Sequence, residues 1–83
     1  MTQDLDFSFN GLPVGYFEEP SYPRTPGRYR YMPYRGLAHY DLVQALASGP
    51  AQCSFNDGDS VYAFVVRSLP EYGVLQIDAI RRS

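Results

Sequence analysis

The last third of the chain carries three apolar segments separated by two turn signals, and this pattern constrains the fold most. The segments span residues 51–55, 60–69 and 74–81, and an Asn-Asp-Gly-Asp turn and a Pro-Glu-Tyr-Gly turn separate them. Short strands joined by tight turns pair with their sequence neighbours in antiparallel order. We therefore expect a three-stranded β-meander. Its middle strand should lie in the centre of the sheet, because that segment is apolar on both faces.

The last of these segments alternates in character along its length. Its two sets of side chains are Leu75, Ile77 and Ala79, and Gln76, Asp78 and Ile80. Successive side chains of a strand point to opposite faces of the sheet. The alternation predicts that the first set is buried and that the second set is mostly exposed.

The N-terminal part of the chain also has the pattern of two short strands joined by a tight turn. Residues 6–9 and 14–17 flank Asn10-Gly11, and Asn-Gly is a strong signal for a tight hairpin turn. Pro13 weakens this hairpin, because proline donates no backbone hydrogen bond. Met1 to Asp4 are expected to be a loose end.

A further strand is expected over residues 28–32, where arginine and tyrosine alternate. The alternation places Tyr29 and Tyr31 on one face, expected to be the core, and Arg28 and Arg30 on the other. The arginine face should therefore meet solvent or a ligand. The preceding residues 19–27 are rich in proline and predict a stiff surface loop.

One helix is expected, over residues 37–48. The side chains at helical spacing along it are His39, Leu42, Val43 and Leu46. Gly49-Pro50 should end the helix, since neither residue continues it well. The element order then gives a single α+β domain over residues 1–83, with an antiparallel sheet and one helix. The alternative is a sheet curled into a small half-open barrel, and no residue pattern separates the two.

Length and composition limit what the domain can be. The chain has 83 residues, enough for one core, and 45% of them are hydrophobic, enough to fold. The single Cys53 cannot form an internal disulfide, and no apolar run is long enough to span a bilayer. These features predict a cytoplasmic protein with no membrane insertion.

The side chains that carry catalysis are scarce. The chain has one histidine, one cysteine and no lysine, so we expect no enzymatic activity. A His39–Cys53 dyad is conceivable, but a lone cysteine in a strand is usually a small core residue. His39 is better explained by a hydrogen bond at the edge of the core. We expect no metal, because the oxygens of residues 56–59 lack the spacing of a calcium loop, and no cofactor, because no phosphate-binding loop is present.

The best functional clue is a segment rich in tyrosine, arginine and proline over residues 16–40. Residues 21–40 contain four arginines and no acid, whereas residues 1–20 contain four acids and no base. Tyrosine and arginine are enriched where one protein surface grips another molecule. The candidate partner-binding residues are Tyr22, Arg24, Arg28, Arg30, Tyr34 and Arg35. A purely structural role is the competing interpretation, with tyrosines in the core and arginines paired with acids such as Glu18 and Glu19.

Three functions fit these candidates. The first is a protein–protein interaction domain, with self-pairing into a homodimer if residues 28–32 or the last strand lie at a sheet edge. The second is single-stranded nucleic-acid binding, which the net charge of −2 disfavours. The third is capture of a small anion by the arginines. The first is the prediction that we carry forward.

Overall fold

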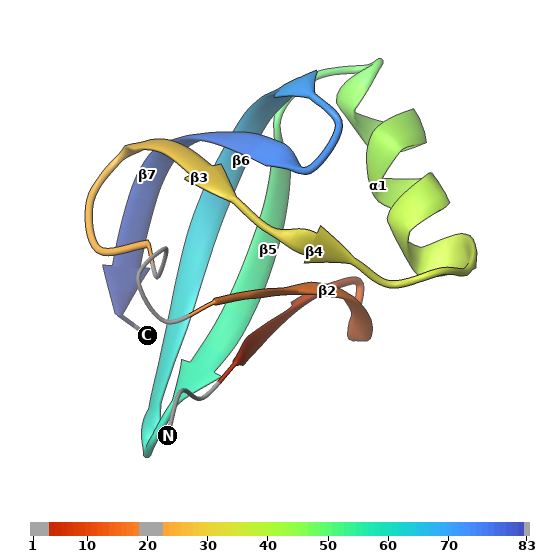
Figure 1. The fold of residues 1–83 in the computed structure, drawn as a ribbon. Helices are drawn as coiled ribbons and strands as arrows, with labels where there is room; N and C mark the ends of the chain where they lie inside the picture. Colours follow the sequence, from red (N-terminus) through yellow and green to blue (C-terminus); the bar gives the residue numbers. More distant parts are fainter. Residues whose placement is uncertain (1–3, 19–22, 83) are drawn as a thin grey trace.

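The computed structural model describes residues 4–18 and 23–82, which form an antiparallel sheet and one helix (Figure 1). The elements, in chain order, are β1 (Leu5–Phe9), β2 (Leu12–Phe17), β3 (Gly27–Arg30), β4 (Met32–Pro33), α1 (Leu37–Leu46), β5 (Ala51–Asp57), β6 (Ser60–Glu71) and β7 (Val74–Arg82). The strand order is β3-β7-β6-β5-β1-β2-β4. The predicted α+β domain with a C-terminal meander is confirmed. The sheet curls into a nearly closed barrel, which is the alternative that the sequence left open. Of the four residues expected to be a loose end, Met1 to Gln3 lie outside the described residues.

One continuous stretch of chain closes the barrel. β3 and β4 follow each other in the sequence, yet they lie at opposite ends of the strand order: β3 pairs with β7 and β4 pairs with β2. Tyr31, between them, donates its backbone N–H to the carbonyl of Gly73 at 2.9 Å. Tyr34 donates its backbone N–H to the carbonyl of Val14, also at 2.9 Å. The first half of this stretch is therefore held by the β6–β7 hairpin and the second half by β2.

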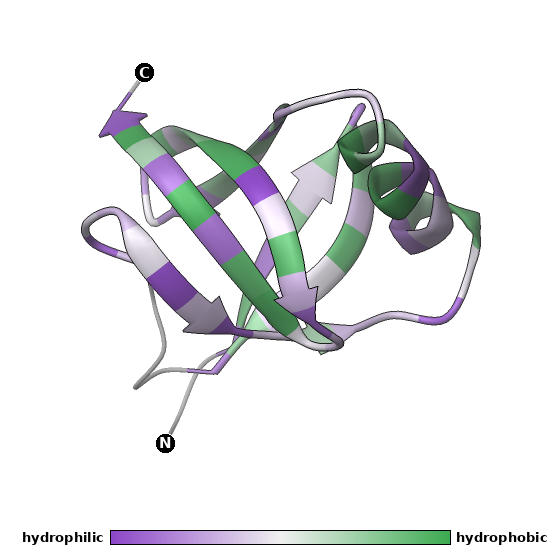
Figure 2. Cartoon of the chain, turned by 90° about the horizontal axis from the view of Figure 1, so that it is seen from above, coloured by the Kyte–Doolittle hydropathy of each residue, from purple (hydrophilic) through white to green (hydrophobic). Residues whose placement is uncertain are grey.

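The core of the barrel is aromatic. The rings of Phe7 and Phe17 stack at 4.7 Å between centroids, and Phe7 also meets Tyr31 at 5.4 Å and Phe64 at 5.8 Å. Leu42 of α1 is fully buried against this core, so the helix covers part of the barrel. Figure 2 shows how apolar and polar residues alternate along the strands, as expected where one face of a sheet is buried.

The N-terminal hairpin is confirmed. Asn10 and Gly11 both have positive φ, 54° and 79°, as a two-residue turn of the primed type requires. Pro13 lies opposite Ser8, next to a register shift between Phe7 and Ser8. The irregular pairing at this point accommodates a residue that cannot donate a backbone hydrogen bond.

The helix is shorter than predicted, and it ends at Leu46 instead of residue 48. The backbone N–H groups of Ala47, Ser48 and Gly49 bond to carbonyls three residues earlier. This tighter turn ends the α-helical pattern before Gly49-Pro50 is reached.

The prediction for the end of the last strand is wrong. Val65 pairs with Ala79 and Val66 pairs with Ile77, so Asp78 is an extra residue in β7. A β-bulge of this kind shifts the alternation by one residue. Ala79 is consequently exposed, whereas Ile80 packs against the core.

Candidate functional site

Arg28 and Arg30 lie on the outer face of β3, and both are exposed. The alternation that the sequence predicted is present, because Tyr29 is half-buried against the core and Tyr31 is buried. Across the ladder Arg28 lies opposite Gln76 in β7, and its Nε donates a hydrogen bond to Gln76 Oε1 at 3.2 Å. β3 therefore presents two guanidinium groups side by side on its outer face.

A hollow of about 360 Å³ opens beside these two arginines. Its lining residues are Arg28, Tyr29, Arg30, Pro70, Glu71 and Val74. Val74 lies opposite Arg30 and is buried, so it supplies an apolar floor. Within the described residues, no carboxylate lies within ion-pair distance of either guanidinium. The hollow thus places two cations beside Pro70 and Val74, and Glu71 is the acid in its wall.

The phenol of Tyr29 holds the loop that leads into β3. Its hydroxyl donates to the backbone carbonyl of Thr25 at 2.6 Å and accepts a bond from the Thr25 N–H at 3.3 Å. The Arg24 N–H lies at 3.4 Å from the same oxygen. Tyr29 thereby fixes the start of the strand that carries the arginines.

The remaining predicted site residues do not join this surface. Tyr34 lies beside β1 and β2: its ring is 5.6 Å from that of Tyr16, and its hydroxyl donates to Asp6 at 2.5 Å. This hydrogen bond to the Asp6 carboxylate is the main cause that raises the pKa of Tyr34 to about 12. Arg35 is exposed in the turn before α1, and Arg24 forms an ion pair with Asp57 at 3.5 Å. Tyr22 lies outside the described residues.

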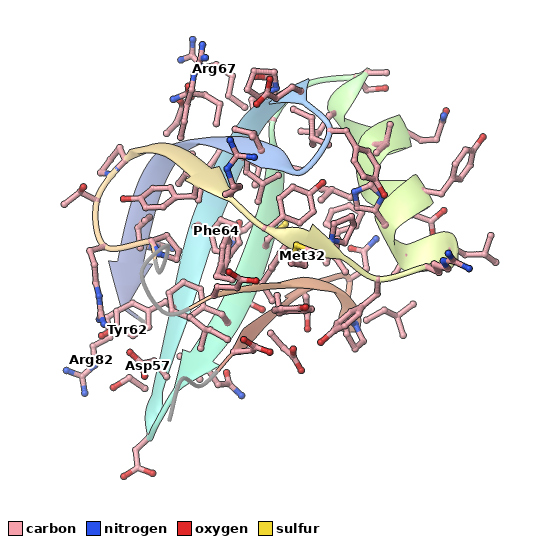
Figure 3. The ribbon with its side chains drawn as sticks, viewed as in Figure 1. Met32, Asp57, Tyr62, Phe64, Arg67 and Arg82 are labelled. Atoms are coloured by element: carbon pink, nitrogen blue, oxygen red, sulfur yellow. The ribbon has the colours of Figure 1, made fainter. Side chains whose placement is uncertain are left out.

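The other arginines are distributed over the ends of the barrel. Figure 3 shows Arg67 and Arg82 projecting outward near opposite ends, whereas Phe64 lies inside. Arg67 is paired with Asp78 at 2.7 Å. Arg81 and Arg82 are exposed at the end of β7. These residues provide a comparison set for Arg28 and Arg30, which share one face of one strand.

His39 and Cys53 do not form the dyad that the sequence left open. His39 Nε2 lies 2.6 Å from the hydroxyl of Tyr31, and its ring meets that of Tyr72 at 5.9 Å. Burial raises the pKa of Tyr31, so the hydroxyl keeps its proton and can donate it to a neutral imidazole. Burial also raises the pKa of the Cys53 thiol to about 12, so the thiolate is scarce. His39 therefore has the expected hydrogen bond at the edge of the core.

The stability of the protein is expected to fall as the pH drops below about 6.5, the ordinary pKa of histidine. Burial lowers the pKa of His39 in the folded state, so the unfolded chain binds more protons between the two pKa values. The stabilising contribution of neutral His39 is thus fully present above pH 6.5, and it is lost as the pH falls below that value. Urea unfolding of the native protein and of His39→Gln, measured from pH 5 to pH 8, checks this. Glutamine can still bond Tyr31 but does not titrate, so an identical pH slope in the two proteins would contradict the assignment.

Sequence reasoning missed part of the arginine surface. The hollow is completed by Pro70, Glu71 and Val74, and Gln76 bonds Arg28. These residues follow β3 by about forty positions, and the pairing of β3 with β7 brings them together. No local pattern indicates that pairing, although the turn at residues 70–73 was visible.

A second hollow, of about 430 Å³, is acidic and lies at β1 and β5. Asp4, Asp6, Ser8 and Asn56 are among its lining residues. Among the described residues, no group of three histidine, cysteine or acidic side chains is placed to hold a metal ion. This acidic hollow therefore lies on other strands than Arg28 and Arg30 of β3.

Comparison with protein-family models, with curated proteins and with solved structures finds no match to this chain. The helix that the structure describes, with 10 residues, is too short to cross a membrane. The candidate site rests on the geometry of Arg28, Arg30 and the hollow beside them.

Proposed function

We propose that the chain is a small, non-enzymatic protein-binding domain whose contact surface is centred on Arg28 and Arg30. The observation that carries this proposal is the pair of exposed guanidinium groups on one strand face, with no carboxylate partner in the described structure. Arginine combines a planar set of donors with a weakly hydrated charge, which suits protein interfaces. The exposed Pro70 beside it offers apolar area for a partner.

The rigidity of the surface supports the same proposal. β3 is held by four paired residues of β7 and by the hydrogen bonds of Tyr29 to Thr25. A preordered surface loses less conformational entropy when it binds. The surface is therefore already ordered in the free protein, as a preorganised binding surface would be.

Nucleic-acid binding has less support from this geometry. Such binding combines cations with exposed aromatic rings on which bases stack. Tyr29 packs against the core, and the hydroxyl of Tyr34 donates to Asp6 of β1. Capture of a free anion has the guanidinium groups it needs, but a small anion would make no use of the apolar Pro70 beside them.

The proposal predicts that Arg28→Ala combined with Arg30→Ala abolishes partner capture from cell extracts and leaves the fold intact. The matched control is Arg81→Ala with Arg82→Ala, which removes the same charge from another exposed strand segment. Both variants should keep the native circular dichroism spectrum, because exposed side chains contribute little to stability. Equal capture by the two variants and the native protein would overturn the proposal. A mobility shift of single-stranded DNA that depends on Arg28 and Arg30 would favour the nucleic-acid alternative instead.

A further inference from the structure

The backbone of β3 has one paired side and one open side. Tyr31 donates its N–H to Gly73, so the backbone groups of Tyr31 point toward the β6–β7 hairpin. Backbone groups of successive residues in a strand point to alternate sides. Tyr29 and Gly27 therefore bond toward β7, and the N–H and C=O of Arg28 and Arg30 point away from it. The two exposed arginines thus also direct their backbone groups outward.

No described strand occupies that outward side. β3 is the end of the strand order, and in the described residues β2 pairs with β1 and β4 but not with β3. Its pairing ends with Tyr16 opposite Met32, and Glu18 makes no ion pair with Arg30 in the described structure. Among residues 4–18 and 23–82, no strand pairs with this side of β3 at Arg28 and Arg30.

We infer that this side of β3 takes an extended acidic segment of a partner protein, which adds to the edge of β3 as a further strand. This inference rests on the proposed function and names the chemistry of the partner. The backbone of the added strand would bond the N–H and C=O groups of Arg28 and Arg30. Residues directly opposite each other in antiparallel strands share a face, so acidic residues at alternate positions would meet the two guanidinium groups. The residue between them would face inward, beside Tyr29, and should be apolar.

A second copy of this chain fits this side of β3 poorly. Antiparallel pairing of β3 with itself, centred on Tyr29, places Arg28 opposite Arg30 of the other copy. Centring the pairing on either arginine places that residue opposite itself. Like charges directly opposite each other destabilise a strand pair. The acidic residues 4–6 of a second copy cannot add to this edge as a strand. Leu5 is buried in its own barrel, and both Leu5 and Asp6 already pair with β2.

The backbone geometry also favours a peptide over other anions. A phosphate or a nucleic acid could meet the guanidinium groups, but it offers no regular series of N–H and C=O groups to bond the strand edge. The experiment must therefore measure two contributions to peptide binding separately: the charge of the peptide side chains and the pairing of the peptide backbone with β3.

The probe is a blocked synthetic peptide that alternates glutamate with valine, titrated into the isotope-labelled protein by NMR. We expect the backbone amide signals of Arg28 and Arg30 to shift and their hydrogen exchange to slow. Two matched peptides follow: one has glutamine in place of glutamate, and the other has N-methylated glutamates, which keep the charge but cannot donate to β3. Each should bind about tenfold more weakly or worse, because each loses one of the two kinds of contact.

The outcomes are distinguishable. Equal binding of the N-methylated peptide, or no change at Arg28 and Arg30 with millimolar peptide, overturns strand addition. So do tighter binding of oligothymidylate at these residues and a dimer that pairs through β3 in sedimentation experiments. If these results accompany an Arg28- and Arg30-dependent capture of a protein from extracts, the proposed function stands and only strand addition falls. If capture does not depend on the two arginines, the proposed function falls as well.

Discussion

Replacing Phe7 by alanine is expected to lower the free energy of unfolding by about 3–5 kcal/mol, the usual cost of removing a buried aromatic side chain. Phe7 is completely buried, and its ring contacts Phe17, Tyr31 and Phe64. These partners lie on β2, on the closing stretch between β3 and β4, and on β6. One ring therefore joins three parts of the barrel, and its removal leaves a cavity that none of them can fill alone.

This loss is a large fraction of the total free energy of unfolding, because the domain is small. A stability of about 0.05–0.15 kcal/mol per residue gives about 4–12 kcal/mol for a chain of this length. The variant should therefore be largely or marginally unfolded, with a much lower urea midpoint by circular dichroism. The matched control is Leu12→Ala in the same hairpin, because Leu12 is 55% exposed and should change stability by less than about 0.5 kcal/mol. A Phe7→Ala variant as stable as this control would show that β1 lies outside the cooperative core.

Local signals in the sequence were sufficient for the elements of the fold. The turn at Asn10-Gly11, the helical spacing from His39 to Leu46 and the meander after it all depend on residues within a few positions of one another. The β-bulge at Asp78 was not predictable from alternation, because Leu75 to Ile80 reads as a regular strand. The physical reason is that a bulge is defined by the partner strand, β6, as much as by β7.

Closure of the barrel depends on contacts that are distant in the sequence. It requires β3 to pair with β7 and β4 to pair with β2, so that Arg28 lies opposite Gln76 and Gly15 lies opposite Pro33. No local rule gives these pairings. The same reason explains the site: alternation predicted the exposed face of Arg28 and Arg30, but not the hollow beside it.

The separation of Tyr34 from the arginine surface has a related cause. The chain changes its partner from β7 to β2 within the few residues after Arg30. Residues that are close in the sequence are thus assigned to different partner strands. The cluster of arginine and tyrosine in one short segment predicted a single binding surface. The change of partner strand separates Tyr34 from Arg28 and Arg30, so these residues do not form one surface.

Replacing Gly15 by alanine is expected to destabilise the protein by about 1–3 kcal/mol, the range typical of overpacking. Gly15 is buried in β2, where it pairs with Pro33 of β4. A Cβ at this position would lie 2.5 Å from the backbone oxygen of Met32 and 3.0 Å from the Cα of Pro33. Because the clash is with backbone, rotation of a side chain cannot relieve it, and β4 must move away from β2. Urea unfolding measures the loss of stability.

The same substitution should loosen the closure of the barrel before it affects the rest of the fold. The Tyr34 N–H donates to the Val14 carbonyl beside Gly15, so its hydrogen exchange should accelerate more than that of the β5–β6 ladder. Gly58→Ala is the control, because its Cβ would meet nothing within 4 Å and only the cost of its positive φ, about 1 kcal/mol, should remain. If Gly15→Ala costs no more than Gly58→Ala and leaves the Tyr34 amide protected, close contact between β2 and β4 does not hold the barrel shut. If the Tyr34 amide alone loses protection, the closing stretch is a separate unit of low stability, and the open edge at Arg28 and Arg30 belongs to the part of the fold that yields first.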